Sequence, residues 1–343
     1  MSEPIVRTTI LDIARELNVA AATVSRALND HPAISIATRE AVKQAARRMN
    51  YQPNKIASSL RLGRSKIIGV IIPSAEINFF GSVIHGIEKV ASRNGYNVLL
   101  YQSNEQYELE KKAVQTFLHS RVDGVLASIS KETINLKHYA DLKSKGVPLV
   151  LFDRAHESLQ VPSVVVNDYQ GAFDATSHLI QQGCRRIAHI GGQQHVTNFN
   201  QRLRGYIDAL NVHNIAVDDD LIAYGKVSIE SGRECMKNLL SRNPDALFAV
   251  EDFTALGAIQ TIKEAGLRIP EDVAIIGFAN EKFSEYLTPS LSTVNQHTVR
   301  MGEEAATLFF ELLQKKGSSK LPPRKLVLQP EIIVRASSAV KPG

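Results

Sequence analysis

Several polar residues follow apolar runs of the chain that are expected to form strands, and they could bind a small polar molecule. Ligands of parallel sheets usually bind at the carboxyl ends of the strands. Carboxylates, amides and an arginine suit sugar hydroxyls or a phosphate, and Phe79 and Phe253 could stack on a sugar ring or a base. Two of the residues, Asn167 and Asp168, could equally cap the helix expected at 169–182. The candidates at strand ends are Asn78, Phe79, Asp153, Arg154, Asn167 and Asp168.

A second group lies on a short helix expected from Ala21 to Leu28 and could bind DNA. Arg26 can donate hydrogen bonds to guanine or to phosphate. The hydroxyl and amide side chains suit phosphate oxygens, whereas the two alanines offer only apolar contact, for example with a thymine methyl group. The alternative for each residue is ordinary helix surface. The candidate contacts on this helix are Ala21, Ala22, Thr23, Ser25, Arg26 and Asn29.

The charge of the chain supports the DNA interpretation. Residues 1–64 contain ten Lys and Arg but five Asp and Glu, so their excess equals the formal net charge of +5 of all 343 residues. The remainder is therefore neutral. A small basic segment attached to a large neutral one is typical of a polyanion-binding module joined to a separate body.

Other classes of chemistry lack their motifs. The chain has no GxGxxG, Walker, GxSxG or HExxH pattern and no His or Cys group with metal-ligand spacing. We therefore expect no catalytic residue, no metal and no cofactor, and keep an α/β enzyme as a remote alternative. Cys184 and Cys235 are expected to be reduced core thiols, with a redox pair as the alternative. No apolar stretch approaches the roughly 20 residues of a membrane helix, and the opening residues do not resemble a secretory signal, so we expect a cytoplasmic, nucleoid-associated protein without a membrane partner.

Three short helices are expected to position the DNA-binding residues. Thr9 can cap a helix over 10–17 and is also a candidate DNA contact. Asn18 can adopt the left-handed conformation of a tight turn before the helix at 21–28. Ser35 is a good N-cap for a third helix that reaches to about residue 50. Two short helices joined by a short turn predict a helix-turn-helix.

Residues 51–64 are expected to form a short helix or a linker. Pro53 fits the first turn of a helix, and this helix is too short to be stable alone. Asn54, Ala57 and Leu60 are further candidate DNA contacts, because two copies could pair on DNA and push Leu60 into a minor groove as a wedge. A plain linker is the alternative.

The rest of the chain alternates apolar runs with helical segments, which indicates parallel sheets covered by helices on both faces. We therefore predict an N-terminal all-α helix-turn-helix headpiece followed by a two-lobed α/β domain. The expected strands are 67–73, 97–102, 122–129, 148–153, 164–166, 187–191, 221–224, 246–251, 273–278, 291–294 and 326–334.

The chain resembles the LacI/GalR family of bacterial repressors, and most closely its catabolite-control and sugar-operon branch, over residues 8 to about 338. The resemblance implies a domain like that of periplasmic binding proteins, base-reading roles for Ala21, Ala22 and Arg26, and an intercalating role for Leu60. It also implies that Arg202 and Asp252 bind an effector. The motifs that carry it are Thr9-Ile10-x-Asp12-Ile13-Ala14, Val19-x-x-x-Thr23-Val24-Ser25-Arg26-x-Leu28-Asn29, Ser35-x-x-Thr38-Arg39, Tyr51-x-Pro53-Asn54-x-x-Ala57 and Ile67-Ile68-Gly69-Val70-Ile71-Ile72-Pro73.

Three positions depart from the family pattern. Ala20 stands where a serine N-cap is usual, which should cost the second helix about 1 kcal/mol. Glu251 stands where asparagine is common, and Ala279 where an aspartate usually binds the effector. A lost carboxylate should alter which hydroxyls are read, so the effector of a well-known member cannot be assumed.

The resemblance also implies an organisation. We expect a DNA-binding headpiece at 1–50, a hinge at 51–64 and an effector domain at 65–340. The first lobe is expected at about 65–165 and 295–322, and the second at about 166–294 and 323–340.

The expected function is that of a sequence-specific transcriptional regulator, a repressor whose affinity for double-stranded operator DNA is set by a sugar, sugar derivative or phosphorylated sugar between the lobes. The tail after Arg335 shows no heptad repeat, so a homodimer is favoured over a tetramer. Induction and corepression both stay open. A sugar-transport binding protein is the alternative, against which the basic headpiece and the missing export signal argue.

Overall fold

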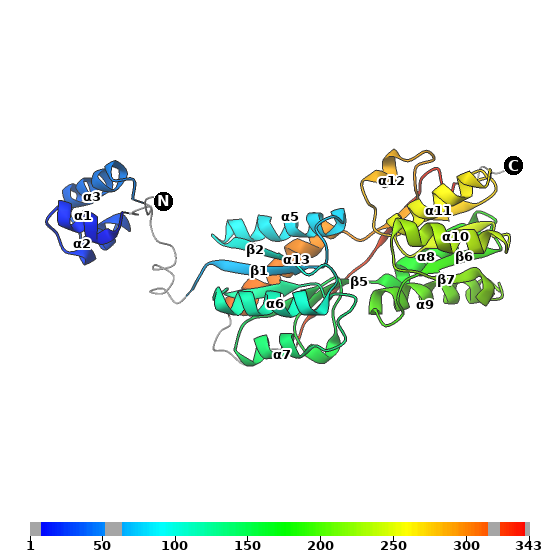
Figure 1. Ribbon diagram of the computed structural model, residues 1–343, viewed down its shortest axis with the longest axis horizontal. Helices are drawn as coiled ribbons and strands as arrows, with labels where there is room; N and C mark the ends of the chain where they lie inside the picture. The colour runs from blue at the N-terminus through cyan, green and yellow to red at the C-terminus, as the bar shows by residue number, and fades with distance from the viewer. Residues whose placement is uncertain (1–7, 52–63, 315–322, 340–343) are drawn as a thin grey trace, which may run out of the picture. The chain divides into compact units, whose positions relative to one another are not determined.

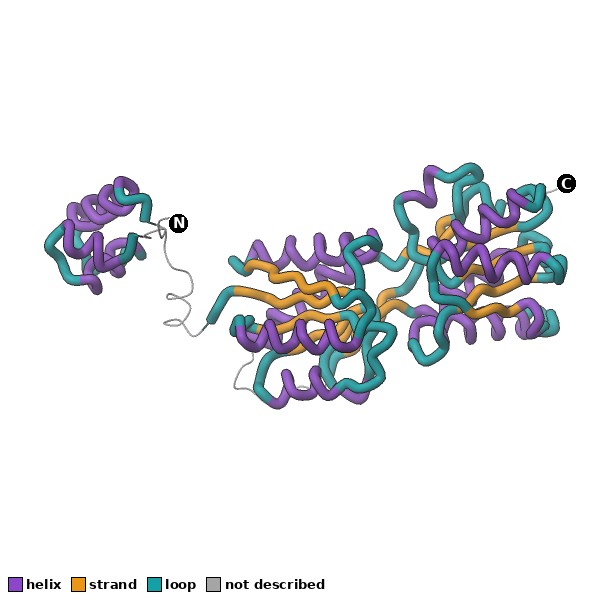
Figure 2. The backbone as a smooth tube through the Cα atoms, in the orientation of Figure 1, coloured by secondary structure: helices purple, strands orange, loops and turns teal. Residues whose placement is uncertain are grey.

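The computed structural model describes residues 8–51, 64–314 and 323–339 and divides the chain into two compact units, Met1–Ser65 and Lys66–Gly343 (Figure 1). The predicted contacts Asn54, Ala57 and Leu60 lie outside the described residues. The described helices and strands of the second unit form two lobes, each a parallel sheet between two layers of helices (Figure 2). The predicted fold class is confirmed.

Within its described residues, 8–51 and 64–65, the first unit forms a cluster of the helices α1 (Ile10–Glu16), α2 (Ala21–Leu28) and α3 (Ile36–Arg48). Thr9 and Asp12 form a capping box at α1, Asn18 has a φ of 50°, and Ser35 caps α3, all of which follow from local sequence. Ala20 gives α2 no side-chain cap, as predicted. The small core fixes the angle of α2 and contains Ile13, Ala14, Val24, Ala27, Val42, Ala45 and Ala46.

The first lobe contains a six-stranded sheet in the order β11-β5-β4-β3-β1-β2. One face is covered by α5 and α13, and the other by α6 and α7 (Figure 1). Its elements are β1 (Ile67–Ile72), α5 (Asn78–Arg93), β2 (Asn97–Gln102), α6 (Tyr107–His119), β3 (Gly124–Ala127), α7 (Lys137–Ser144), β4 (Leu149–Phe152), β5 (Ser163–Val166), α13 (Thr298–Gln314) and β11 (Lys325–Leu328).

The second lobe contains a four-stranded sheet in the order β7-β6-β8-β9, with α8 and α9 on one face and α10 and α11 on the other. A two-stranded antiparallel sheet of β10 and β12 packs against α8. Its elements are α8 (Asp168–Gln181), β6 (Ile187–Gly191), α9 (Thr197–Val212), β7 (Ile222–Tyr224), α10 (Ile229–Leu240), β8 (Ala246–Ala249), α11 (Asp252–Glu264), β9 (Ala274–Ile276), α12 (Phe283–Tyr286), β10 (Thr293–Asn295) and β12 (Glu331–Ile333).

The end of the chain corrects one predicted boundary. The expected strand 326–334 is two strands, because the chain breaks at Gln329 and Pro330. β11 pairs in parallel with β5 in the first sheet, and β12 pairs with β10 beside the second lobe. The assignment of residues 323–340 to the second lobe is therefore wrong for 323–328.

The two cysteines are free and buried, as predicted for core thiols. Cys184 belongs to the core between the second sheet and α8 and α9, whereas Cys235 belongs to the core on the other face of that sheet. Burial raises the pKa of Cys184 to about 11, which keeps it protonated. This arrangement does not support the alternative of a redox pair.

Candidate functional site: an interlobe cavity and an exposed helix

Several of the predicted ligand residues lie at the junction of the two lobes. A cavity of about 50 Å³, here called the inner cavity, lies between them. Three of the residues predicted to bind a ligand, Phe79, Asp153 and Arg202, line it. The complete lining is Ile77, Phe79, Phe80, Lys131, Asp153, Arg154, Asn198, Phe199, Arg202, Val227, Glu251, Ala279 and Gln296.

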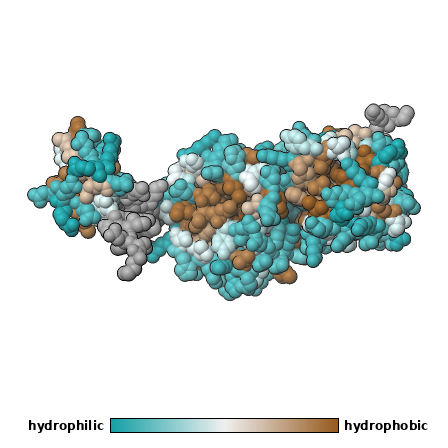
Figure 3. Space-filling model, turned by 45° about the horizontal axis from the view of Figure 1, so that its top comes forward, coloured by the Kyte–Doolittle hydropathy of each residue, from teal (hydrophilic) through white to brown (hydrophobic). Residues whose placement is uncertain are grey.

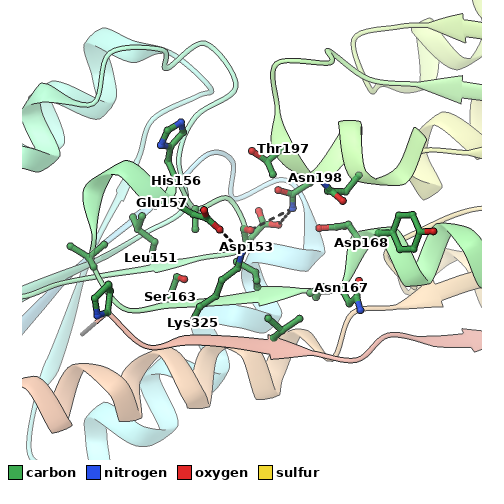
Figure 4. A pocket seen from close by; sticks show the side chains of 18 of the residues that line it. Leu151, Asp153, His156, Glu157, Ser163, Asn167, Asp168, Thr197, Asn198 and Lys325 are labelled. Carbon is green, nitrogen blue, oxygen red and sulfur yellow. Dashed lines mark hydrogen bonds and ion pairs between the residues drawn. The ribbon is translucent and has the colours of Figure 1, made fainter. Parts of the chain in front are cut away.

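A larger cavity of about 630 Å³, here called the outer cavity, adjoins the inner one along β4, β5 and β11 (Figure 4). Asp153 and Asn198 line both cavities, and the side-chain amide of Asn198 donates to the Asp153 carboxylate over 3.1 Å. Asn167 and Asp168 line the outer cavity beside them. Pockets for small ligands usually measure about 300–1,000 Å³, so the inner cavity must widen before it can hold a sugar.

Arg202 is almost fully buried and is held from several sides. Its guanidinium pairs with Asp168 at 2.7 Å, donates to the carbonyl oxygen of Val250 at 2.7 Å, and lies 3.6 Å from the centre of the Phe278 ring. Burial raises the pKa of Asp168 to about 6, and the charge of Arg202 opposes that rise. Because Asp168 starts α8 and Arg202 belongs to α9, this pair holds these two helices together beside the cleft.

The other positive side chains of the inner cavity already have acidic partners. Arg154 donates to both carboxylate oxygens of Glu105, at 2.7 and 3.0 Å. The ammonium of Lys131 lies 3.5 Å from the same carboxylate, and burial lowers its pKa. Sequence reasoning missed Lys131 and Asn198, which line the inner cavity, and Glu105, which pairs with Arg154 and Lys131. No local pattern reports how loops and the second lobe bring these residues together.

Glu251 is the least compensated acid of the inner cavity. Burial raises its pKa to about 8, and the nearby carboxylates of Asp252 and Glu281 add to the rise. The residue had been noted only as a departure from the family pattern. At neutral pH its carboxyl group is therefore mostly protonated and can donate a hydrogen bond to a ligand.

Asp252 and Phe253 are not among the residues that line the inner or the outer cavity. The Asp252 carboxylate accepts hydrogen bonds from the Glu281 N–H and from the hydroxyls of Ser284 and Thr293, all at 2.7–2.9 Å. Its helix directs it into the second lobe, while the preceding residue, Glu251, faces the cavity. The geometry therefore gives no support to the predicted role of Asp252 in effector binding, and it places Glu251 at the inner cavity instead. Phe253 packs against Phe283 with ring centres 5.0 Å apart, and we no longer expect it to stack on a ligand.

Two further predicted residues have partners within the protein. Asn78 starts α5 and forms a side-chain hydrogen bond with Glu281. Asn167 is the N-cap of α8, where its side chain accepts from the Gln170 N–H at 3.2 Å. Both the capping and the ligand interpretations of Asn167 therefore stand, because the same residue lines the outer cavity.

In the first unit, the predicted DNA contacts fall into two groups. Ala22, Arg26 and Asn29 are exposed on α2, and Arg26 makes no ion pair with another described residue. Ala21, Thr23 and Ser25 are half-buried along the same helix. Thr9 is exposed but its hydroxyl is engaged with Asp12 in the capping box. An exposed arginine on the second helix of a helix-turn-helix is placed to enter the major groove.

This fold and site define a class of protein: a helix-turn-helix DNA-binding unit joined to a two-lobed ligand-binding domain. Models of known families agree, since "Bacterial regulatory proteins, lacI family" matches residues 9–54 and "Periplasmic binding protein-like domain" matches 176–338. The HTH-type transcriptional repressor PurR of Pasteurella multocida (strain Pm70) is 33% identical over 332 residues, which cover 96% of this chain and 98% of that protein.

Solved structures give the same result. The transcriptional regulator CelR in complex with cellobiose is 31% identical, with a TM-score of 0.73 over 96% of this chain and 100% of that one. The lac repressor dimer bound to operator and the anti-inducer ONPF shares the fold, with a TM-score of 0.86 at 24% identity over 98% of this chain and 100% of that one. The chain belongs to the lacI family of bacterial regulatory proteins and is a DNA-binding transcriptional regulator under small-molecule control.

These relatives are regulators rather than enzymes. Among the described residues, no group of three or more His, Cys, Asp or Glu side chains could hold a metal ion. No described helix is long and apolar enough to cross a membrane.

The raised pKa of Glu251 predicts a pH-dependent stability. A carboxyl whose pKa is higher in the folded chain binds its proton more tightly there, so the stability it contributes is full below its unfolded pKa and is lost as pH rises through the folded value. Between pH 6.5 and 8.5, above the pKa of about 6 for Asp168, we expect the free energy of unfolding to fall by at most about 1.4 kcal/mol per pH unit.

Urea unfolding followed by circular dichroism at several pH values measures this slope. Glu251→Gln should remove most of it, whereas Glu234→Gln, an exposed change on α10, should leave it intact. An equal slope in all three proteins would show that Glu251 does not hold its proton in the folded chain.

Proposed function

We propose that this chain is a repressor that binds a two-fold symmetric operator as a dimer through α2, and that a sugar or sugar derivative in the interlobe cleft sets its affinity. The observation that carries the ligand class is the convergence of Phe79, Asp153, Asn198 and Arg202 from both lobes on one cavity. An aromatic ring beside a carboxylate and an amide suits the faces and hydroxyls of a sugar. The cellobiose held by the related CelR supports the same class.

The charged residues of the cleft are compatible with two classes of ligand, a phosphorylated sugar and a neutral sugar. Lys131 and Arg154 could turn from Glu105 toward a phosphate, which favours a phosphorylated sugar. Asp153 favours a neutral sugar, because an ionised carboxylate repels a phosphate. Thermal unfolding of the full chain with glucose, cellobiose and glucose 6-phosphate separates the two, since a ligand that binds the folded form raises the melting temperature by mass action.

Selection of bound sequences from a random pool of double-stranded DNA tests the operator assignment. We expect a palindromic site, because a dimer presents α2 to two half-sites about one helical turn apart or a multiple of it. If no sequence is enriched over the starting pool, and the affinity varies with salt concentration but not with sequence, specific recognition is contradicted.

We propose the free edge of the first lobe as the dimer surface. β2 is an edge strand of the first sheet, and Leu100 on it is 42% exposed. Apolar side chains gather over this lobe in Figure 3. An exposed apolar edge strand is ordinarily covered by another surface, and a second copy would cover it here.

Leu100→Lys is expected to weaken self-association about tenfold or more, because it buries an unpaired charge at the contact. Sedimentation equilibrium measures the dissociation constant. Ile134→Lys is the matched control, since Ile134 is 84% exposed and lies outside the sheet, in the loop that precedes α7. If both variants associate as the parent does, the dimer uses another surface.

A further inference from the structure

The N-terminus of α5 is capped from the opposite lobe. Its N-cap residue, Ile77, makes no side-chain capping bond. The first N–H groups of a helix have no partner within the helix. Here the Phe79 N–H donates to Glu281 Oε1 at 3.1 Å, and Asn78 also hydrogen-bonds the Glu281 side chain. Glu281 lies 202 residues away, between β9 and α12 of the second lobe.

The segment that carries Glu281 is held rigidly by Asp252. The Asp252 carboxylate accepts from the Glu281 N–H, at 2.8 Å, and from the hydroxyls of Ser284 and Thr293. A Cβ atom on Gly277 would lie 2.2 Å from Asp252 Oδ1, so only glycine fits this approach. The buried carboxylate thus fixes the backbone from which Glu281 reaches across to α5.

The same segment is held in an uncommon backbone conformation. Ala279 has a φ of 127°, a region that residues with a side chain rarely adopt, and Asn280 has a φ of 53°. Such conformations persist where the surroundings impose them. Here the Ala279 N–H donates to the carbonyl oxygen of Val294, and Arg335 donates to Asn280 Oδ1 at 2.9 Å.

This segment also borders the ligand site. Ala279 lines the inner cavity, and Glu251, which lines it too, directly precedes Asp252. A ligand that displaces either residue therefore acts on the backbone that positions Glu281. The inner cavity is about 50 Å³, well below the usual size of about 300–1,000 Å³ of a ligand pocket, so this part of the cleft must widen before a ligand can occupy it.

We propose that Glu281 is a positioning residue that ties α5 of the first lobe to the effector-sensing segment 277–281 of the second, and that this tie must break when the cleft opens. The inference deepens the proposed function, on which its regulatory meaning rests. Other contacts between described residues also cross the cleft, among them Asn198 to Asp153, His195 to the carbonyl oxygen of Lys131, and the Lys131 ammonium over the Phe199 ring. Glu281 differs from them because it caps a helix, so its release also exposes the first turn of α5.

Hydrogen exchange measured by mass spectrometry on the ligand-free full chain tests this role without an operator or an effector. Glu281→Ala should raise the exchange rate about five- to tenfold in the first turn of α5. The rate should also rise in the cleft segments 128–131 and 195–199, while α10 and α11 keep their rates. Glu281→Gln keeps an acceptor oxygen and should restore the parent pattern.

Glu285→Ala is the matched control, because Glu285 is an exposed acid on the adjacent α12. Exchange at α5 that is equal in Glu281→Ala and Glu285→Ala would overturn the proposal. A uniform rise over all segments in Glu281→Ala would also overturn it, because it would assign Glu281 a general role in stability. Either result leaves the ligand and operator assignments standing, so the two failures are distinguishable.

Discussion

Arg202→Ala is expected to destabilise the effector domain by about 3–5 kcal/mol, because it leaves the Asp168 carboxylate buried without its partner. The change also removes the donors to Val250 and the contact with the Phe278 ring. Since the pair joins α8 and α9 at the cleft, we also expect the response of operator binding to the effector to be lost. Urea unfolding measures the first effect, and operator binding with and without ligand measures the second.

A second substitution distinguishes the cost of the unpaired Asp168 charge from the cost of the lost packing around Arg202. In Arg202→Ala/Asp168→Asn the unpaired charge is gone, so the double variant should be more stable than Arg202→Ala alone. Arg204→Ala, an exposed change on the same helix, should cost little in either measurement. If the double variant is as unstable as the single one, the ion pair is not the source of the loss. If Arg202→Ala still responds to effector as the parent does, the site assignment is wrong.

Arg26→Ala should weaken binding to the selected operator by about 1–3 kcal/mol, which is roughly 5- to 150-fold. Arg26 is exposed on α2, where it can form two hydrogen bonds to a guanine edge. Binding to a scrambled duplex should fall much less, since phosphate contacts contribute equally to every sequence. Fluorescence anisotropy at one fixed salt concentration gives both affinities.

Arg47→Ala provides the matched loss of charge, because Arg47 is exposed in the last turn of α3. We expect Arg47→Ala to lower the affinity for the operator and for the scrambled duplex by a similar factor, or to leave both unchanged. Equal losses for the two duplexes in Arg26→Ala would assign Arg26 to the phosphate backbone and leave base reading to other residues of α2.

The headpiece was predictable because its signals are local. Capping by Thr9 and Ser35 and the left-handed turn at Asn18 each depend on a few neighbouring residues, and the structure has all three. The buried faces are harder to predict. Ala41 of α3 is exposed, whereas Ala27 of α2 is fully buried. Alanine is small and weakly apolar, so the spacing of alanines predicts poorly which face of a helix is buried.

The cleft was only partly predictable because its contacts are distant in sequence. The location of Asp153 and Phe79 at the cleft could be predicted from the rule that ligands bind at the ends of strands. The choice of Asp252 came from the family resemblance. The structure places Glu251 at the inner cavity instead, a difference of phase in the first turn of α11 that the pattern of strand and helix does not give. Glu281 contacts a partner 202 residues away in the sequence, and β11 returns to the first sheet. Neither contact can be predicted from local sequence, because each depends on how the two lobes assemble.

The central claim is that a ligand bound between the lobes changes the affinity of α2 for DNA. The most direct test is the affinity of the full chain for its selected operator, at fixed salt, with and without a saturating amount of the sugar that most raises its melting temperature. We predict a change of about 5- to 150-fold, the usual range of coupling between two sites, in the parent chain and none in Arg202→Ala. A sugar that stabilises the chain and leaves its operator affinity unchanged would contradict the account.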